Sequence, residues 1–459
     1  MSNTTWQEGF RSSLGHGLQT GYVDVLCLVR SQVMDAVMKG GNYPVDPTVS
    51  SIIPVMNFDF DNNQSNESSS RLVGEGAETS TFQAGQSALK ASFKLPMLVT
   101  PFNWIDQPIA ELWSLAKYAT WGTPAIVRAK LIDVNGQPIV YNTGTTSIYV
   151  DNVFDFLDVP LPFTAVLSPG TAAEQSVSVT AVNKYYRKLT LASATTVSQP
   201  VNASIMVLFD SAGGPDFEPA FGLLSLREGF LAPCLVDKLT INAKVGEVVM
   251  IDCSVVSGGI WRKEQVDIRN ALPGVIGSRT SKIYRAVEGL GIQTSSGSET
   301  VPSGQFGLGS ALGDRLLSGY EGLEMSWLGV SSSSITIDNS IKEVYTPHSS
   351  VTDLKNNQKD NVFPFALISE GRKISGRIEY MAPIEPWAAA ERLTASSKIN
   401  GGLTLDFGCC KIVCPDIIWK PSSSSSQAGD TETRHLDWFL ISDDYNDMPD
   451  LAYSTRGNS

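Results

Sequence analysis

The chain has 459 residues, enough for roughly two or three domains that each bury a core. Charged residues make up 18% of it and hydrophobic residues 42%, the balance of an ordered globular protein. The net charge of -13 and the lack of a Lys/Arg run argue against a nucleic-acid-binding surface, which needs cations to neutralise phosphates. With no secretory signal and no apolar stretch of about 18 residues, we expect a soluble chain made in a cytosol.

The first 48 residues precede the first strand-like segment, and we expect residues 1–48 to form an N-terminal arm. Within them, YVDVLCLVRSQVMDAVMKG places apolar residues towards one face at helical spacing, which predicts a helix. Gly and Pro in GGNYPVDP then end this helix. The segment has no counterpart later in the chain, so it is expected to act as an arm or a docking strap.

Two strands and a helix are predicted next. VSSIIPVMNFDF at 49–60 predicts a strand, the polar residues 61–80 predict a loop, and the alternation in SALKASFKLPMLV predicts a second strand. Pro108 then opens the helix PIAELWSLAKYAT, at a first-turn position that suits proline. An apolar stripe predicts that this helix is amphipathic and covers a sheet: Ile109, Leu112, Trp113, Leu115, Ala116 and Ala119.

A β-rich insertion is predicted from about 130 to 220. Short strand-like runs, among them TTSIYVDNVF, QSVSVTAV, RKLTLAS and NASIMVLF, are separated by turn residues, which is typical of a small surface domain. The segment CLVDKLTINAKVGEVVMIDCSVVSG then returns to strand patterns. Residues 259–325 are rich in Gly and Ser and predict a long, partly extended connector.

The last part of the chain repeats the order strand, loop, strand, helix, strand. SSSSITIDN predicts a strand with Ile335 and Ile337 on one face, 340–370 predict a loop, and RKISGRIEYM predicts a strand. A helix is expected from Pro386, followed by the return strand GGLTLDFGCCKIVC, the flexible loop SSSSSQAGDTETR and the final strand RHLDWFLISDD.

Equivalent positions in the two halves are separated by a nearly constant distance. The offset is about 280 residues for four pairs, Val49 and Val330, Lys90 and Lys373, Pro108 and Pro386, and Gly122 and Gly401. This spacing predicts one domain at 49–258 and a second copy at 326–459. Two copies in a chain halve the number of chains that a ring needs.

No motif predicts catalysis, a metal or a cofactor, and we expect a protein that is not an enzyme. CCKIVC is typical of a buried strand with apolar thiols, and GLGSALG from Gly307 lacks the strand that a dinucleotide loop follows. DFDNNQSNE from Asp59 lacks the Gly and the closing Glu of a calcium loop. DDYNDMPD from Asp443 fits a solvated turn better than a cation site, and the three His lie far apart.

The repeated unit resembles the phage tail-tube domain, a β-sandwich or barrel with one flanking helix and one long loop. In the second half the resemblance is carried by ITIDN, the loop to Gly371, RKISGRIEY, the helix from Pro386, GGLTLDFGCCKIVCP and WFLISDDYNDMPDLAYS. In the first half it is carried by ESSSRLVGEGAETSTFQAGQSALKASFKLPML, the helix and DKLTINAKVG. The implied fold is mainly β, a duplicated tail-tube domain with a small β insertion domain.

The chain is similar to the two-domain type known in some long-tailed phages, in which a trimer forms a pseudo-hexameric ring. The resemblance implies a virion structural protein, the major tail tube subunit, whose stacked rings form the channel for ejection of phage DNA. It implies other copies of the chain, the tape measure protein, the tail terminator and distal tail proteins as partners, with double-stranded DNA passing without specific binding. The implied location is the virion tail, after synthesis in the host cytoplasm, with no membrane insertion and no cofactor.

Two surfaces follow from this resemblance. The strands ASFKLPML and ISGRIEYM are the candidates for the inner wall, with these residues towards the lumen: Lys90, Ser92, Lys94, Lys373, Ser375, Arg377 and Glu379. The loops 61–85 and 340–370 are the candidates for ring stacking, through Glu67, Arg71, Glu75, Glu78, Lys342, Glu343, Asp353 and Lys355, with plain solvent loops as the alternative. An acidic net charge is expected to repel phosphate and let DNA slide, although basic residues on these strands oppose a uniformly acidic lumen.

Three other hypotheses stay open. A β-rich tail-tip or carbohydrate-binding module is the main alternative, because the nine Trp make stacking on sugars conceivable. A hydrolase with an unfamiliar site would need paired carboxylates in a cleft, which no spacing indicates. The tube protein of a bacterial secretion machine is a further hypothesis, and the internal duplication argues against it.

Overall fold

The structure is a computed structural model in which most described residues lie in strands. It describes residues 25–31, 34, 50–68, 82–99, 107–119, 126–184, 186–208, 220–225, 229–244, 247–261, 282–283, 291–295, 330–344, 364, 366–381, 402–406, 410–414, 417–420, 424–425, 433–440 and 450–453. Among these, α3 (Gln107–Tyr118) is the one α-helix described along its whole length, Ser31 and Met34 are also helical, and strands predominate, so the prediction of a mainly β protein is confirmed.

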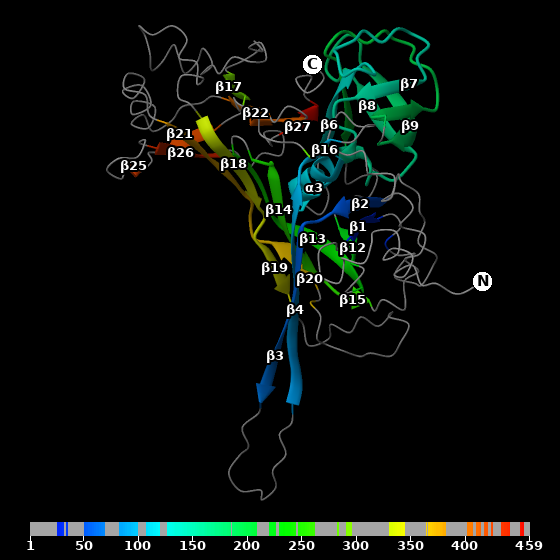
Figure 1. Ribbon diagram of the computed structural model, residues 1–459. Coiled ribbons are helices and arrows are strands. Elements are labelled where there is room, and N and C mark those ends of the chain that lie inside the picture. The colour runs from blue at the N-terminus through cyan, green and yellow to red at the C-terminus, as the bar shows by residue number, and fades with distance from the viewer. Residues whose placement is uncertain are drawn as a thin grey trace, which may run out of the picture.

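A single 13-stranded sheet runs through both halves of the chain (Figure 1). Eight of its strands lie side by side, every neighbouring pair antiparallel, and we term them the wall. In order across the sheet they are β3 (Asn57–Ser68), β4 (Phe82–Pro96), β14 (Met250–Ser257), β13 (Gly229–Lys244), β18 (Val330–Asp338), β21 (Lys373–Met381), β26 (Thr433–Leu440) and β24 (Ile417–Lys420). The pairing of β13 with β18 makes the sheet continuous between the two halves.

Strict alternation of side chains gives the wall one core face and one polar face. In β4, Phe93 and Leu95 are buried whereas Lys94 is exposed, because successive residues of a strand point to opposite faces. In β18, Ile335 and Ile337 are fully buried, which confirms the prediction that they share a face. Both strands that the sequence nominated for a wall, β4 and β21, therefore lie in one sheet.

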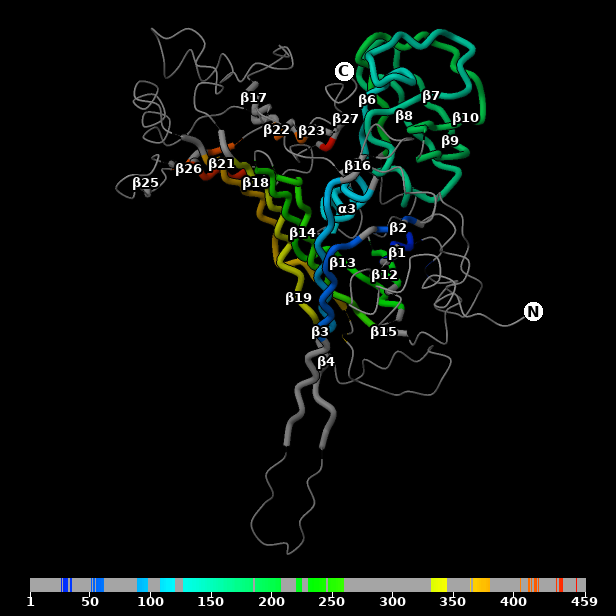
Figure 2. Tube along the Cα trace, in the orientation of Figure 1, coloured from blue at the N-terminus to red at the C-terminus, as the bar shows by residue number. Residues whose placement is uncertain are grey.

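The strand β13 belongs to two sheet regions. Its part from Lys238 pairs with β18, whereas its first part, up to Cys234, pairs with β12 (Phe221–Ser225) and with β15 (Ile260–Trp261). Beyond β12 lie β1 (Val25–Arg30) and β2 (Ser50–Pro54). Leu28, Ile53 and Leu223 of this second region belong to the same core as the wall. Figure 2 shows β1, β2 and β12 on the opposite side of β4 from β18 and β21.

The prediction of a helix in YVDVLCLVRSQVMDAVMKG is wrong over Val25–Arg30, because this segment is the strand β1, paired on both sides. Leu26, Leu28 and Val29 are all buried between neighbours. A short apolar run of this kind fits a buried strand as well as a helix, and only its pairing decides. This part of the expected arm is thus built into the sheet.

The helix α3 is confirmed and contacts the sheet as predicted, but the amphipathic pattern does not leave its polar side exposed. Residues 108–119 are all buried, including Glu111, Ser114 and Lys117. α3 contacts β13 and β2, and it also contacts the short 3-10 helix η1 (Phe154–Phe156). The helix is enclosed because a second domain covers the face that would otherwise meet water.

That second domain is a closed barrel of six strands, which falls in the region of the predicted β-rich insertion. The order around it is β10 (Lys188–Leu191), β7 (Ser147–Val150), β6 (Ile126–Ile132), β11 (Ser204–Leu208), β8 (Phe163–Leu167) and β9 (Gln175–Asn183). Alternate residues such as Phe163, Ala165 and Leu167 fill its interior. Closure leaves no free strand edge on this domain.

The polar segment predicted as a loop at 61–80 is a strand over its first eight residues. β3 runs to Ser68, and its register with β4 continues to Phe82. β14 stops opposite Leu89, so among the described strands the rest of the β3–β4 hairpin pairs only with itself, and it runs out from the sheet (Figure 1). The ladder is made by backbone groups, which explains why an Asn- and Ser-rich sequence forms it.

The loop predicted at 340–370 contains a hairpin, because β19 (Ile341–Val344) pairs with β20 (Ala366–Ser369). The return strand GGLTLDFGCCKIVC is two antiparallel strands, β22 (Gly402–Asp406) and β23 (Cys410–Cys414), not one. The flexible loop SSSSSQAGDTETR contributes β25 (Ser424–Ser425) beside β26.

Another strand, β27 (Asp450–Tyr453), follows the one predicted to be last and pairs with β23. The predicted connector contributes β16 (Lys282–Ile283), which pairs with β5 (Leu98–Val99), and β17 (Gly291–Ser295), which pairs with β22. The helix expected from Pro386 lies outside the described residues.

Candidate functional site

The polar face of the wall gathers all seven side chains that the sequence nominated for a lumen. Lys90, Ser92 and Lys94 on β4 are exposed and alternate with buried residues. On β21, Lys373 and Arg377 are exposed, and Ser375 and Glu379 are half-buried. The register continues this face across the sheet from β4 to β21. Five residues lie opposite one another in turn along this line, namely Lys94, Asp252, Thr240, Thr336 and Ser375.

Ion pairs bridge neighbouring strands on this face. Lys94 Nζ lies 3.0 Å from Asp252 Oδ1, between β4 and β14. Arg377 Nε donates to Asp437 Oδ1 at 2.6 Å, between β21 and β26. All four side chains are 34–50% exposed, so water screens both pairs.

Charges of the two signs are nearly balanced on the polar face. The described residues that the register places there include seven cations and six anions, namely Lys90, Lys94, Lys238, Lys244, Lys373, Arg377 and Lys420, with Asp59, Asp61, Asp252, Asp338, Glu379 and Asp437. The chain as a whole carries -13. The described part of this surface is therefore not acidic, in line with the basic residues that the sequence places on these strands, and the excess negative charge lies elsewhere.

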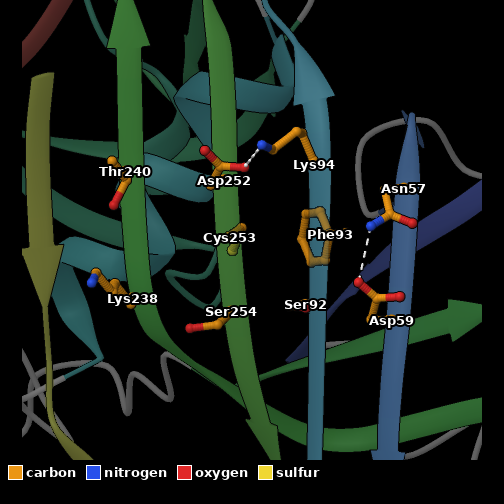
Figure 3. A pocket seen from close by; sticks show the side chains of 10 residues that line it. All are labelled: Asn57, Asp59, Ser92, Phe93, Lys94, Lys238, Thr240, Asp252, Cys253 and Ser254. Carbon is orange, nitrogen blue, oxygen red and sulfur yellow. Dashed lines mark hydrogen bonds and ion pairs between the residues drawn. The ribbon is translucent and has the colours of Figure 1, made fainter. Parts of the chain in front are cut away.

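A shallow hollow of about 350 Å³ lies on the polar face over β3, β4, β14 and β13 (Figure 3). Asp59, Lys94 and Asp252 line it, and Figure 3 shows Lys94 turned to Asp252 and Asn57 turned to Asp59. These side chains are held by one another. The hollow is part of a pleated surface, without the enclosure that positions a substrate.

Neither a cluster of metal ligands nor a thiol of lowered pKa is found among the described residues. No three His, Cys, Asp or Glu side chains come together there as a metal site requires. Burial raises the pKa of the Cys234 thiol to about 12 and also raises that of Cys253, so neither is a ready nucleophile. No described helix is long and apolar enough to span a membrane.

Both ends of the wall are strand edges. Among the described strands, β3 pairs only with β4, while β24 pairs only with β26. Asp59 is exposed on β3, and Lys420 is exposed on β24 with its Nζ 4.8 Å from the centroid of the Phe439 ring. An edge of this kind presents unpaired backbone groups to another chain.

The residues nominated for ring stacking fall partly on strands. Glu67 lies on β3, and Lys342 and Glu343 lie on β19, so the prediction of loops is wrong at these positions. Lys342 Nζ lies 2.7 Å from Glu370 Oε1, both more than half exposed. Arg71, Glu75, Glu78, Asp353 and Lys355 lie outside the described residues.

A buried charged cluster, which the sequence analysis missed, joins the barrel to the sheet. Its six side chains, three of each sign, are at most 8% exposed, namely Arg30, Lys117, Lys184, Glu111, Asp155 and Asp158. Arg30 on β1 donates to Asp158 at 2.5 Å, and Lys184 of the barrel lies 3.3 Å from Glu111 on α3. Lys117 on α3 lies 3.2 Å from Asp155 on η1.

Within this cluster, burial raises the pKa of Asp158 to about 6, an effect that Glu111 and Asp155 increase and that Arg30 only partly offsets.

The sequence did carry a signal for the cluster. Polar residues on α3 form a stripe one residue wide, Glu111, Ser114 and Lys117, and a helix so nearly apolar all round is typically buried.

Comparison with known proteins adds nothing to these observations: no protein-family model matches the chain, and no curated protein matches it in sequence.

Proposed function

We propose that this chain is the major tail tube subunit of a phage, a virion structural protein. Three copies would form a pseudo-hexameric ring, and stacked rings would form the channel through which DNA is ejected. The observation that carries the proposal is the order of strands in the wall. Two sets of four, β3-β4-β14-β13 and β18-β21-β26-β24, lie in tandem and leave β3 and β24 as its edges.

The two sets match in detail, which supports a duplicated domain. FDFDNN at Phe58–Asn63 and ITIDNS at Ile335–Ser340 begin them with the same pattern. Asp61 lies opposite Lys90, as Asp338 lies opposite Lys373. The ion pair of Lys94 with Asp252 takes the same place as that of Arg377 with Asp437.

The core face matches as well, with large and small residues exchanged. Phe93 lies opposite Cys253 in the first set, and Gly376 lies opposite Trp438 at the same place in the second. A Cβ on Gly376 would lie 2.3 Å from Trp438 Cζ2, so the indole fills the space that the missing side chain leaves. Exchange of this kind preserves the core volume while it removes the sequence similarity.

The junction within the chain supports the formation of a ring. β13, the last strand of the first set, pairs with β18, the first strand of the second. Eight strands of alternating direction leave β24 antiparallel to β3, so the same type of junction can form between β24 of one chain and β3 of the next. A head-to-tail contact that closes gives a ring, and it removes both free edges.

Passage of DNA fits the balanced polar face. Each of the paired cations already has a carboxylate partner, as Lys94 has in Asp252 and Arg377 in Asp437. A phosphate must displace that partner, and short Ser and Thr side chains between the pairs offer no strong site. Weak, evenly spread interaction lets a duplex slide without being trapped.

Electron microscopy of the purified protein, at several protein and salt concentrations, tests the proposal. We expect rings or tubes about 100 Å wide, the scale of six small domains around a pore. Threefold symmetry of the density, with two similar domains per chain, would support the trimer. Compact single particles under every condition would overturn it, and a glycan array would then test the carbohydrate-binding alternative.

A further inference from the structure

We propose that β24 of one chain pairs antiparallel with β3 of a second copy in one defined register, in which Lys420 lies opposite Asp59 and Trp419 lies opposite Phe60. The inference rests on the proposed ring and goes beyond it, because it names the residues that select the partner edge. The junction between β13 and β18 within the chain is the template.

The register follows from positions matched across the sheet. Asp252 on β14 and Asp437 on β26 occupy equivalent positions in the two sets, since each forms the ion pair described above. Thr240 lies opposite Asp252 and Lys420 lies opposite Asp437, so Lys420 in the second set is equivalent to Thr240 in the first. Thr240 in turn lies opposite Thr336, two residues before Asp338.

Asp61 on β3 is equivalent to Asp338 on β18, because they lie opposite Lys90 and Lys373. The residue two positions before Asp61 is Asp59, which is therefore equivalent to Thr336. The pair of Thr240 with Thr336 at the junction within the chain thus corresponds to a pair of Lys420 with Asp59 between chains. The next pair at the junction within the chain is Leu239 with Ile337. By the same correspondence, Trp419 lies opposite Phe60 between chains.

The burial of the core face is consistent with β3 having β4 as its one partner among the described strands. Ile335 and Ile337 on β18 are fully buried, because β13 lies beside them. Phe58 and Phe60, their counterparts on β3, are only half-buried although they pack against the same core. A strand added beside β3 would complete their burial, as β13 does for the two isoleucines.

Charge selects which edge is added. β3 exposes Asp59 and Asp61 on the polar face, whereas β24 exposes Lys420. Pairing of β3 with another β3 brings acidic strands together, and like charges across a strand pair are destabilising. Pairing of β24 with β3 instead places Lys420 opposite Asp59, which favours a head-to-tail ring over a symmetric dimer.

Cysteine cross-linking tests the register directly. At the template position Thr240 Oγ1 and Thr336 Oγ1 are 3.0 Å apart, so side chains of this length meet there. The variant with Asp59→Cys and Lys420→Cys is expected to form disulfide-linked chains under mild oxidation. A matched variant with Asp61→Cys and Lys420→Cys, two residues out of register, is expected to form at least tenfold less, and each single cysteine variant measures the background.

Charge exchange tests the selection. Lys420→Asp and Asp59→Lys each place like charges at the junction and are expected to raise the concentration needed for assembly by about tenfold. The double variant restores an opposite pair and is expected to assemble like the unmodified protein. Lys130→Asp, at an exposed barrel lysine, controls for the change in net charge.

The outcomes separate this inference from the tube proposal. Tubes that form while the Asp59 and Lys420 cysteines stay unlinked, or while the Asp61 variant links better, would overturn the register and leave the tube standing. Linked chains without rings or tubes would support the pairing and overturn the tube. A double charge variant no better than the single variants would overturn the charge selection.

Discussion

Two regions of this molecule use the same charged residue types in opposite surroundings. The buried cluster holds Arg30, Glu111 and Asp158 at 1–2% side-chain exposure, between β1, α3 and the barrel. The polar face of the wall holds Lys94 with Asp252, and Arg377 with Asp437, at 34–50% exposure. The distances are similar, so the difference between the regions is the water.

The comparison teaches what each region does for the protein. In the cluster, every charge has lost its hydration and depends on its neighbours, so the pairs fix how the barrel sits on α3 and the sheet. On the wall, water competes with every pair, so the charges add little stability and instead pattern a surface. Three predictions test this difference, in order of decreasing effect.

The largest effect is expected from Arg30→Met. The substitution leaves Glu111 and Asp158 buried with less positive charge around them, and breaking a buried pair in this way costs about 3–5 kcal/mol. Urea denaturation, followed by tryptophan fluorescence, measures the free energy of unfolding. A loss below about 1 kcal/mol, the range of exposed pairs, would contradict the assignment of the cluster as buried and dry.

A pH dependence is expected from Asp158. Its pKa is raised from 3.8 unfolded to about 6 folded, so the native state binds the proton more tightly. Its contribution to stability is therefore full below about pH 4 and is lost as the pH rises through about 6, by roughly 3 kcal/mol for a shift of about two units.

The measurement for Asp158 is the urea midpoint between pH 4 and pH 7. Relative to Asp158→Asn, which cannot titrate, the unmodified protein is expected to lose stability as the pH rises across this window. Asp252→Asn, at an exposed pair of the wall, is the matched control. Parallel profiles for the unmodified protein and Asp158→Asn would contradict the prediction.

The smallest effect is expected from Arg377→Met on the wall. Asp437 stays in contact with water when its partner is removed, so the loss in unfolding free energy should be below about 1 kcal/mol and should shrink in high salt. The same denaturation assay, at low and high salt, measures it. A salt-independent loss as large as that of Arg30→Met would show that the wall pair is also desolvated.

Much of the wall could be predicted from the sequence. Alternation located β4, β18 and β21 and assigned the polar face of each, because a period of two fixes which side chains share a face. The segments around β1 and β3 were misjudged for different reasons. β1 is a short apolar run that fits two periods, and the far part of β3 is polar and held by its backbone ladder.

The candidate site was predicted only in part, because its two edges depend on which strands become neighbours. Lys420 was not nominated at all, and it stands out only once β24 is seen to end the wall. The proposed repeat rests on spacing in the sequence and is weak in residue identity. In the proposed repeat, Phe93 with Cys253 corresponds to Gly376 with Trp438, and this correspondence depends on the strand register, which no local pattern gives.

The sequence by itself determined the class of the fold, the faces of the main strands and the position of α3, since these depend on local period and on helix-start signals. The tertiary structure alone decided that α3 is enclosed and that six charges from four separate segments of the chain share one dry cluster. It also decided that β13 meets β18 and leaves β3 and β24 at the ends. Strand pairing and burial are long-range events, set by what covers each face, and no local pattern records them.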